Sequence, residues 1–127
     1  MILIDSFLAI AMHELALSEG GGAEGLRDIG LLEGALARVR HLSALLRAEP
    51  TIAQLAASYA WGVIRDHPFI DGNKRTAFLV ATAFCEANGY RFQAPEGEPA
   101  VIFEAAAAGE IQEDGLARWF GRHLREM

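Results

Sequence analysis

The side chains best suited to chemistry gather in one short stretch, residues 67–76, which reads HPFIDGNKRT. His67 is the side chain best able to accept a proton near neutral pH. Asp71 offers a hard oxygen ligand of the kind that Mg²⁺ takes when it is shared with substrate phosphates. Lys74 and Arg75 follow as adjacent cations. Together these residue types predict a site for phosphate chemistry, with magnesium as its metal and a histidine as its base.

Local signals place this stretch in a loop that ends at a helix. Pro68 and Gly72 oppose a continuous helix, because proline lacks an N–H and glycine permits positive φ. From Thr76 the sequence becomes apolar, which predicts a buried helix over 76–87. A helix N-terminus carries unpaired N–H groups and a partial positive charge, so it would favour an anion beside the two cations. A solvated structural turn of similar composition is the alternative interpretation.

The order of residues adds a resemblance to a known family. The stretch resembles the Fic/Doc signature His-x-Phe-x-(Asp/Glu)-Gly-Asn-(Gly/Lys)-Arg, with every fixed position filled. The Fic branch has glycine at the position of Lys74 and usually a second arginine at that of Phe78, so both departures point to the Doc branch, the death-on-curing toxins. Residues 25–33 with 37–40, and 108–111, resemble two further Doc blocks, so the similarity covers nearly the whole chain.

The resemblance implies an all-α (mostly α) fold, with a single Doc/Fic-like domain over residues 1–127. This domain would be a bundle of about six helices, with the active-site loop between two central helices. It implies a serine/threonine protein kinase that transfers the γ-phosphate of ATP, with Mg²⁺. It also implies these residue roles: His67 as the catalytic base, Asp71 as the metal ligand, and Gly72, Asn73, Lys74, Arg75 and Arg65 at the nucleotide phosphates.

The same resemblance implies partners. The target would be elongation factor Tu, whose phosphorylation halts translation, and a Phd-type antitoxin would dock a helix and inhibit the toxin. An AMP transferase of the Fic type and a non-catalytic module that grips an antitoxin are the alternatives; Lys74 disfavours the first and the complete motif disfavours the second. Thr82 to Glu86 has the spacing of an internal inhibitory helix, but Ala87 follows it, so we expect core and inhibition by another chain.

Bulk properties set further limits. The length of 127 residues fits one domain, and the 52% hydrophobic and 22% charged residues indicate a folded chain. The net charge of −6 argues against direct DNA binding. We expect Cys85 to be a buried thiol in a reducing cytoplasm. Met1 to Ile4 lacks the features of a leader, and no segment is long enough to span a membrane.

Periodicity and capping residues predict the remaining elements, which are helices over 5–19, from Asp28, from Pro50 or Thr51, over about 99–108 and about 113–126, and an extended piece over 90–93. In the first helix the predicted apolar stripe comprises Phe7, Leu8, Ile10, Ala11, Leu15 and Leu17.

Other residues carry weaker expectations. His13 is predicted to be half-buried or on the surface, without a catalytic role. The Gly20–Gly25 loop is predicted to be a linker, or by resemblance a segment near the site that meets the protein substrate. Trp61 and Trp119 are expected in the core. Three arginines are expected on a solvated face, with partner contact as the alternative: Arg38, Arg40 and Arg47.

Overall fold

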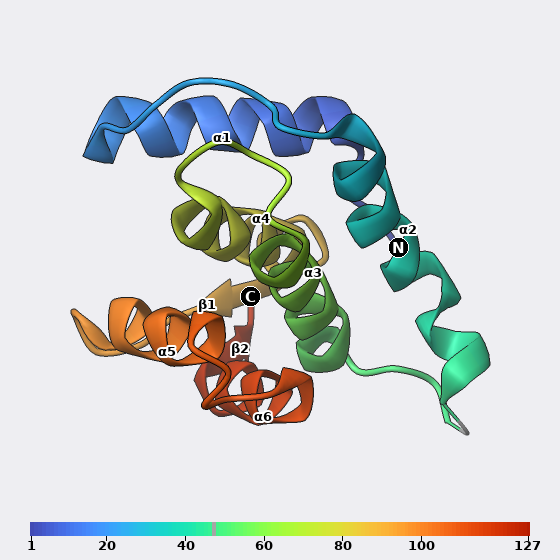
Figure 1. The fold of residues 1–127 in the computed structure, drawn as a ribbon. Helices are drawn as coiled ribbons and strands as arrows, with labels where there is room; N and C mark the ends of the chain where they lie inside the picture. The colour runs from blue at the N-terminus through green and yellow to red at the C-terminus, as the bar shows by residue number, and fades with distance from the viewer. Residues whose placement is uncertain (47) are drawn as a thin grey trace.

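The computed structural model describes residues 1–46 and 48–127, and Arg47 lies outside them. The described residues form six helices and one small antiparallel sheet, which confirms the mostly α expectation. The elements are α1 (Ser6–Gly20), α2 (Ile29–Leu45), α3 (Ile52–Asp66), α4 (Asn73–Ala87), β1 (Tyr90–Phe92), α5 (Glu98–Ala107), α6 (Glu113–His123) and β2 (Leu124–Glu126). Figure 1 shows α1 lying across one end of the bundle, with the loop between α3 and α4 beneath it.

The helix starts follow from local capping. Asp5 accepts a hydrogen bond from the Leu8 N–H, and Asp28 accepts one from the Leu31 N–H, each at the N-cap position. Thr51 and Gln54 form a reciprocal capping box at the start of α3. These short-range bonds confirm the three predicted N-termini.

The helices α3 and α4 form the centre of the molecule, and both are lined by buried residues. Small side chains let other helices approach them closely. A Cβ added at Gly62 of α3 would lie 2.9 Å from the Ala35 Cβ of α2. Tyr59 and Phe84 are 1% and 0% exposed, so truncating either to alanine should cost about 3–5 kcal/mol. The packed helices α3 and α4 therefore give the loop that joins them, residues 67–72, a rigid base.

The C-terminal helix is shorter than predicted. α6 ends at His123 rather than near Glu126, because the chain then pairs with β1 in the register Tyr90 with Glu126 to Phe92 with Leu124. The Phe92 ring packs against the rings of Trp119, Phe120 and His123. The predicted extended piece at 90–93 therefore pairs with β2, which the sequence pattern had assigned to the last helix.

The predicted apolar stripe of α1 was also wrong. The buried residues are Ala9, His13 and Ala16, whereas Phe7 is 84% exposed and Leu15 is 44% exposed. The helix is apolar nearly all round, so periodicity did not distinguish its faces. The small side chains of Ala9 and Ala16 let α1 lie close against α4.

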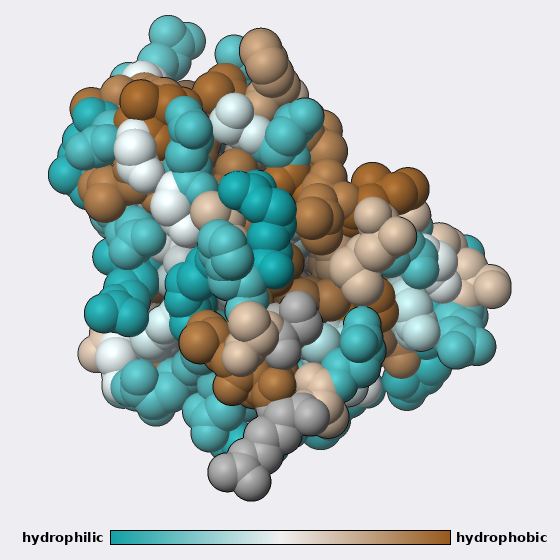
Figure 2. Space-filling view, turned by 90° about the vertical axis from the view of Figure 1, so that its right-hand side faces the viewer, coloured by the Kyte–Doolittle hydropathy of each residue, from teal (hydrophilic) through white to brown (hydrophobic). Residues whose placement is uncertain are grey.

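Other core expectations can be checked in the same way. Cys85 is fully buried, and burial raises the pKa of its thiol to about 12. Trp119 is buried, but Trp61 is half-buried at a cavity wall. Figure 2 shows a side of the molecule on which hydrophilic and hydrophobic side chains are mixed. In the described residues no helix is both long and apolar enough for a membrane span.

Candidate functional site

The loop of residues 67–72 joins two left-handed turns. His67 ends α3 with φ 53° and ψ 54°, and it is the single non-glycine residue of positive φ in the described chain. Gly72, with φ 76°, stands at the N-cap of α4. Between them Phe69 is buried, while His67 and Asp71 have exposed side chains. The two turns therefore hold the histidine and the carboxylate at the surface on either side of a buried anchor.

Asn73 holds that anchor. Its side chain is 4% exposed, with Oδ1 accepting from the Phe69 N–H (3.0 Å) and Nδ2 donating to the Phe69 carbonyl (2.9 Å). The amide is thus committed to the loop backbone. Contact with a phosphate remains a prediction for Asn73, and its backbone N–H, in the unpaired first turn of α4, is the group free to make it.

Asp71 is fixed at both its side chain and its backbone. Oδ2 accepts from the Ala23 N–H (3.1 Å), and Oδ1 accepts from the Gly72 N–H (2.8 Å). The bond from Ala23, and then that from Gly72, lowers the pKa of the carboxyl, with a smaller contribution from the charge of Arg75. Asp71 is exposed, and each carboxylate oxygen can accept a further bond. The described residues form no group of three or more metal-ligating side chains, but a single carboxylate is compatible with Mg²⁺ that is shared with phosphate oxygens.

The glycine-containing segment 21–28 lies along the loop. Leu26 and Phe69 form an antiparallel β-bridge, and the Ile70 N–H donates to the Gly25 carbonyl (3.0 Å). Gly22 has φ 126°, and a Cβ there would lie 2.9 Å from Asp71 Oδ2. The predicted free linker was therefore wrong, because the segment is paired with the motif loop; its contact with a protein substrate stays a prediction.

Arg27 caps the helix that delivers His67. Its Nε donates to the His67 carbonyl (2.8 Å) and its Nη2 donates to the Asp66 carbonyl (2.9 Å). Carbonyls at a helix C-terminus lack partners within the helix, and a cation there also complements the dipole. Arg27 thus stabilises the left-handed turn in which His67 stands.

The two cations of the motif point in different directions. Arg75 donates from Nη1 to the Ala16 carbonyl (2.8 Å) and from Nη2 to the Gly21 carbonyl (2.6 Å), so it caps the C-terminus of α1. Lys74 forms an ion pair with Glu104 on α5. Both line a cavity of about 420 Å³ with apolar walls that include Phe78. The half-buried Phe78 ring meets Phe92 and Phe103 edge to face, so it packs against the core from the cavity wall.

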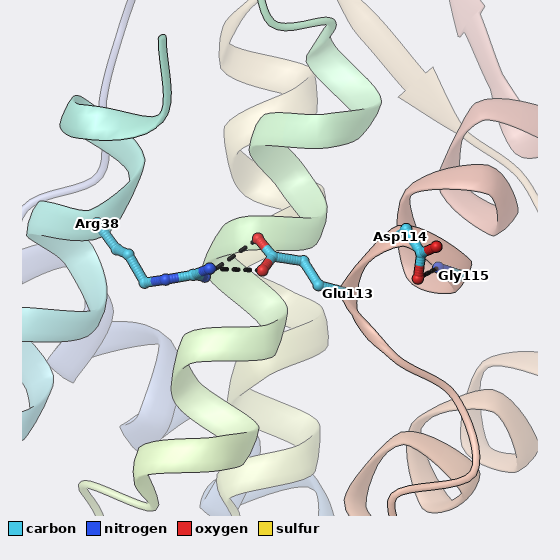
Figure 3. Close-up of polar contacts among 4 residues, drawn as sticks. All are labelled: Arg38, Glu113, Asp114 and Gly115. Atoms are coloured by element: carbon cyan, nitrogen blue, oxygen red, sulfur yellow. Dashed lines mark hydrogen bonds and ion pairs between the residues drawn. The ribbon is translucent and has the colours of Figure 1, made fainter. Parts of the chain in front are cut away.

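Arg65 is not brought to this cavity. It lines a separate cavity of about 840 Å³ between α2, α3 and α6, whose wall also includes Arg38. Figure 3 shows Arg38 reaching across to both carboxylate oxygens of Glu113 (3.0 and 2.5 Å). These hydrogen bonds raise the pKa of Arg38. The solvated face predicted for Arg38 was therefore wrong, and the phosphate contact predicted for Arg65 has no support from its position.

Sequence reasoning missed the part that His13 plays. Its side chain is 4% exposed, its Nε2 lies 2.8 Å from the Asp71 carbonyl oxygen, and its ring stacks on Phe69 at 3.9 Å between centroids. The signal was present, because Ala9, His13 and Ala16 share one helical face at i, i+4 and i+7. Larger apolar residues on the opposite face obscured it.

Comparison with known proteins shows the family of this chain. The model of the Fic/DOC family matches residues 3–85, and the chain belongs to that family. It is 34% identical over 109 residues to "Protein kinase doc" of Escherichia phage P1, covering 85% of this chain and 84% of that protein. It is 38% identical over 74 residues to "Toxin Doc" of Mycolicibacterium smegmatis, covering 58% of this chain and 57% of that protein.

Proposed function

We propose that this chain is the toxin of a toxin–antitoxin pair and acts as a Doc-like protein kinase. The observation that carries the proposal is the complete motif, with Lys74 rather than glycine after Asn73, in a chain similar over most of its length to a protein named as a kinase. The reaction would move the γ-phosphate of ATP to a threonine or serine hydroxyl of a protein. The chain 1–127 would form one domain, since its helices share a common core cluster.

His67 is the proposed base. Its imidazole takes the hydroxyl proton as the oxygen of the target forms its bond to the γ-phosphorus. The bond from that phosphorus to the bridging oxygen breaks, and ADP leaves. The exposed position of His67, at the end of α3 and fixed by Arg27, suits a base that must meet a hydroxyl on another protein. Phosphoryl transfer demands mainly positioning and charge stabilisation, which a small site can supply.

The phosphates would lie at the N-terminus of α4. The N–H groups of Asn73, Lys74 and Arg75 have no carbonyl partner within the helix, and Gly72 has no side chain to cap them. Lys74, which is paired with Glu104 on α5, adds a full positive charge beside this helix end. Gly72 permits close approach of the backbone. Asp71 would hold Mg²⁺, which neutralises charge that develops on the transferred group.

The proposed partners follow from the family. The target by resemblance is elongation factor Tu, and the antitoxin would be Phd-like and supply an amphipathic helix. The apolar cavity beside Lys74 and Arg75 suits such a helix, because its walls are made by Phe78, Phe103 and neighbouring apolar residues. The acidic chain would have no direct contact with DNA, and the pair would act in the cytoplasm.

The test uses ATP labelled at one phosphorus at a time. Purified protein, Mg²⁺ and elongation factor Tu are incubated with γ-labelled or α-labelled ATP, and label on protein is measured together with released ADP or pyrophosphate. We expect γ-label on the target and ADP in solution. Transfer of α-label would establish AMP transfer instead. If no label is transferred to elongation factor Tu or to proteins of a bacterial lysate, and the chain still binds an antitoxin tightly, the result would favour a non-catalytic binding module.

A further inference from the structure

His13 is the buried polar side chain that α1 directs at the motif loop. It occupies the face of Ala9 and Ala16, on a helix that contributes no other buried polar side chain in the described structure. A histidine on such a face is often a satisfied core residue. The partner of its Nε2 distinguishes this one, because that partner is the backbone carbonyl of Asp71, 58 positions away in the sequence.

The bond completes a three-point hold on Asp71. The two carboxylate oxygens accept from Ala23 and Gly72, and the carbonyl oxygen accepts from His13. The carbonyl is drawn inward to α1, so the side chain leaves the backbone on the solvent side. If the inward bond were lost, the peptide between Asp71 and Gly72 could rotate, and rotation would move both the carboxylate and the Gly72 N–H.

The stacking of the His13 ring on Phe69 also restricts movement of the loop. The imidazole lies parallel to the Phe69 ring, at 7° between planes, and Phe69 is itself held by Asn73. A Cβ built at Gly72 would lie 3.7 Å from His13 Nε2, which shows how closely the imidazole meets the turn. His13 thus links the buried anchor of the loop to the residue that bears the carboxylate.

We propose that His13 is a positioning residue that orients the Asp71 carboxylate for its metal, through the hydrogen bond from Nε2 to the Asp71 carbonyl. The metal part of this inference rests on the proposed function. Groups that orient a metal ligand from behind change metal affinity by about 10–100-fold when they are removed.

Two substitutions separate the hydrogen bond from the packing. His13→Phe keeps an aromatic ring to stack on Phe69 and removes the donor. His13→Gln removes the ring and offers an amide N–H near the position of Nε2. His41 on α2 is exposed, so His41→Phe serves as the matched control.

The first measurement is Mg²⁺-dependent ATP binding, by titration of Mg²⁺ at fixed ATP, well below the melting temperature of every variant. We expect the half-saturating Mg²⁺ concentration to rise about tenfold in His13→Phe and less than about threefold in His13→Gln. ATP binding without Mg²⁺ should change little. Unchanged Mg²⁺ dependence in His13→Phe, or equal losses in both variants that follow their melting temperatures, would overturn the proposal.

The second measurement does not need ATP or a target. Amide hydrogen exchange of Ala23 and Gly72, followed by NMR, reports whether the Asp71 carboxylate still accepts their bonds. We expect exchange about tenfold faster in His13→Phe, near-native exchange in His13→Gln, and native exchange in His41→Phe. If the native protein shows no Mg²⁺-dependent ATP binding, the proposed function fails, while this exchange pattern still supports or, if unchanged, overturns the positioning role of His13.

Discussion

The N-termini of α4 and α6 begin with opposite charges. α6 places Glu113 and Asp114 in its first turn, where acidic side chains complement the helix dipole. α4 begins with Asn73, Lys74 and Arg75 after a glycine N-cap, so its first turn holds two cations and no side-chain cap. Neither helix has a side-chain hydrogen bond from its N-cap residue, so the difference lies in the first-turn charges, which favour the dipole at α6 and oppose it at α4.

The partners of these charged side chains also differ between the two helix starts. At α6 the carboxylates are already paired, Glu113 with Arg38 and Asp114 with Arg118. At α4 Lys74 is paired with Glu104, but the guanidinium of Arg75 is held by uncharged carbonyls and takes part in no ion pair among the described residues. A helix start that is unfavourable by itself, by about 0.3–1 kcal/mol per charge, is expected where an anion binds. The comparison therefore supports the proposed phosphate site at α4 and indicates a structural contact at α6.

The largest effect is expected from His67, the proposed base beside α4. His67→Asn keeps a residue type that tolerates the left-handed conformation and removes the imidazole, and His67→Ala tests the same role with a conformational cost of about 1–2 kcal/mol. We expect about 10²–10⁴-fold loss of γ-phosphate transfer in both, with ATP affinity nearly unchanged. Single-turnover transfer and equilibrium binding measure the two quantities. Full activity in folded His67→Asn would remove the base from its role.

The next effect separates the two cavities. Lys74→Ala should weaken ATP binding by about tenfold, or about 1.4 kcal/mol, because its charge lies at the open start of α4. Arg65→Ala, whose side chain lines the cavity beside α6, should bind ATP within about twofold of the native protein. Isothermal titration with Mg²⁺ and ATP gives both constants. Equal losses of ATP affinity in the two variants would mean that the cavity of Arg65 contacts the nucleotide as well as the cavity of Lys74. The contrast between α4 and α6 would then be wrong.

A smaller effect is expected from the ion pair at α6. Arg38→Ala and Glu113→Ala should each lower the free energy of unfolding by about 1 kcal/mol, since the contact is bidentate but its side chains remain 36% and 26% exposed. The double variant should lose less than the sum, because the two residues share one interaction. Urea denaturation measures all three, and ATP affinity should stay native. Additive losses would show that the pair contributes little.

The smallest effect concerns acid. The hydrogen bonds from Ala23 and Gly72 lower the pKa of Asp71 in the folded state. The contribution of Asp71 to stability is therefore fully present above the ordinary carboxyl pKa of 3.8 and is lost as pH falls through the lower folded value. The stability difference between the native protein and Asp71→Asn should be constant above about pH 5 and shrink below pH 4. A difference that grows on acidification would have the wrong sign.

The sequence by itself determined the features that depend on near neighbours. Asp5, Asp28 and Thr51 begin helices because each caps N–H groups within three residues. The motif could be recognised because its histidine, carboxylate and cations are contiguous, and its loop is closed by a bond between Asn73 and Phe69 only four positions apart. Such contacts involve little chain closure, so residue order alone specifies them.

Only the tertiary structure decided which distant groups join the motif. His13 and Ala23 meet Asp71 across 58 and 48 positions, and Arg65 turns to the other cavity although it is two residues from His67. α6 stops at His123 because β1, more than 30 positions earlier, offers a strand partner. These outcomes depend on how closely α1 and α6 pack on the central helices, and packing is set by side-chain volumes on several elements at once rather than by local pattern.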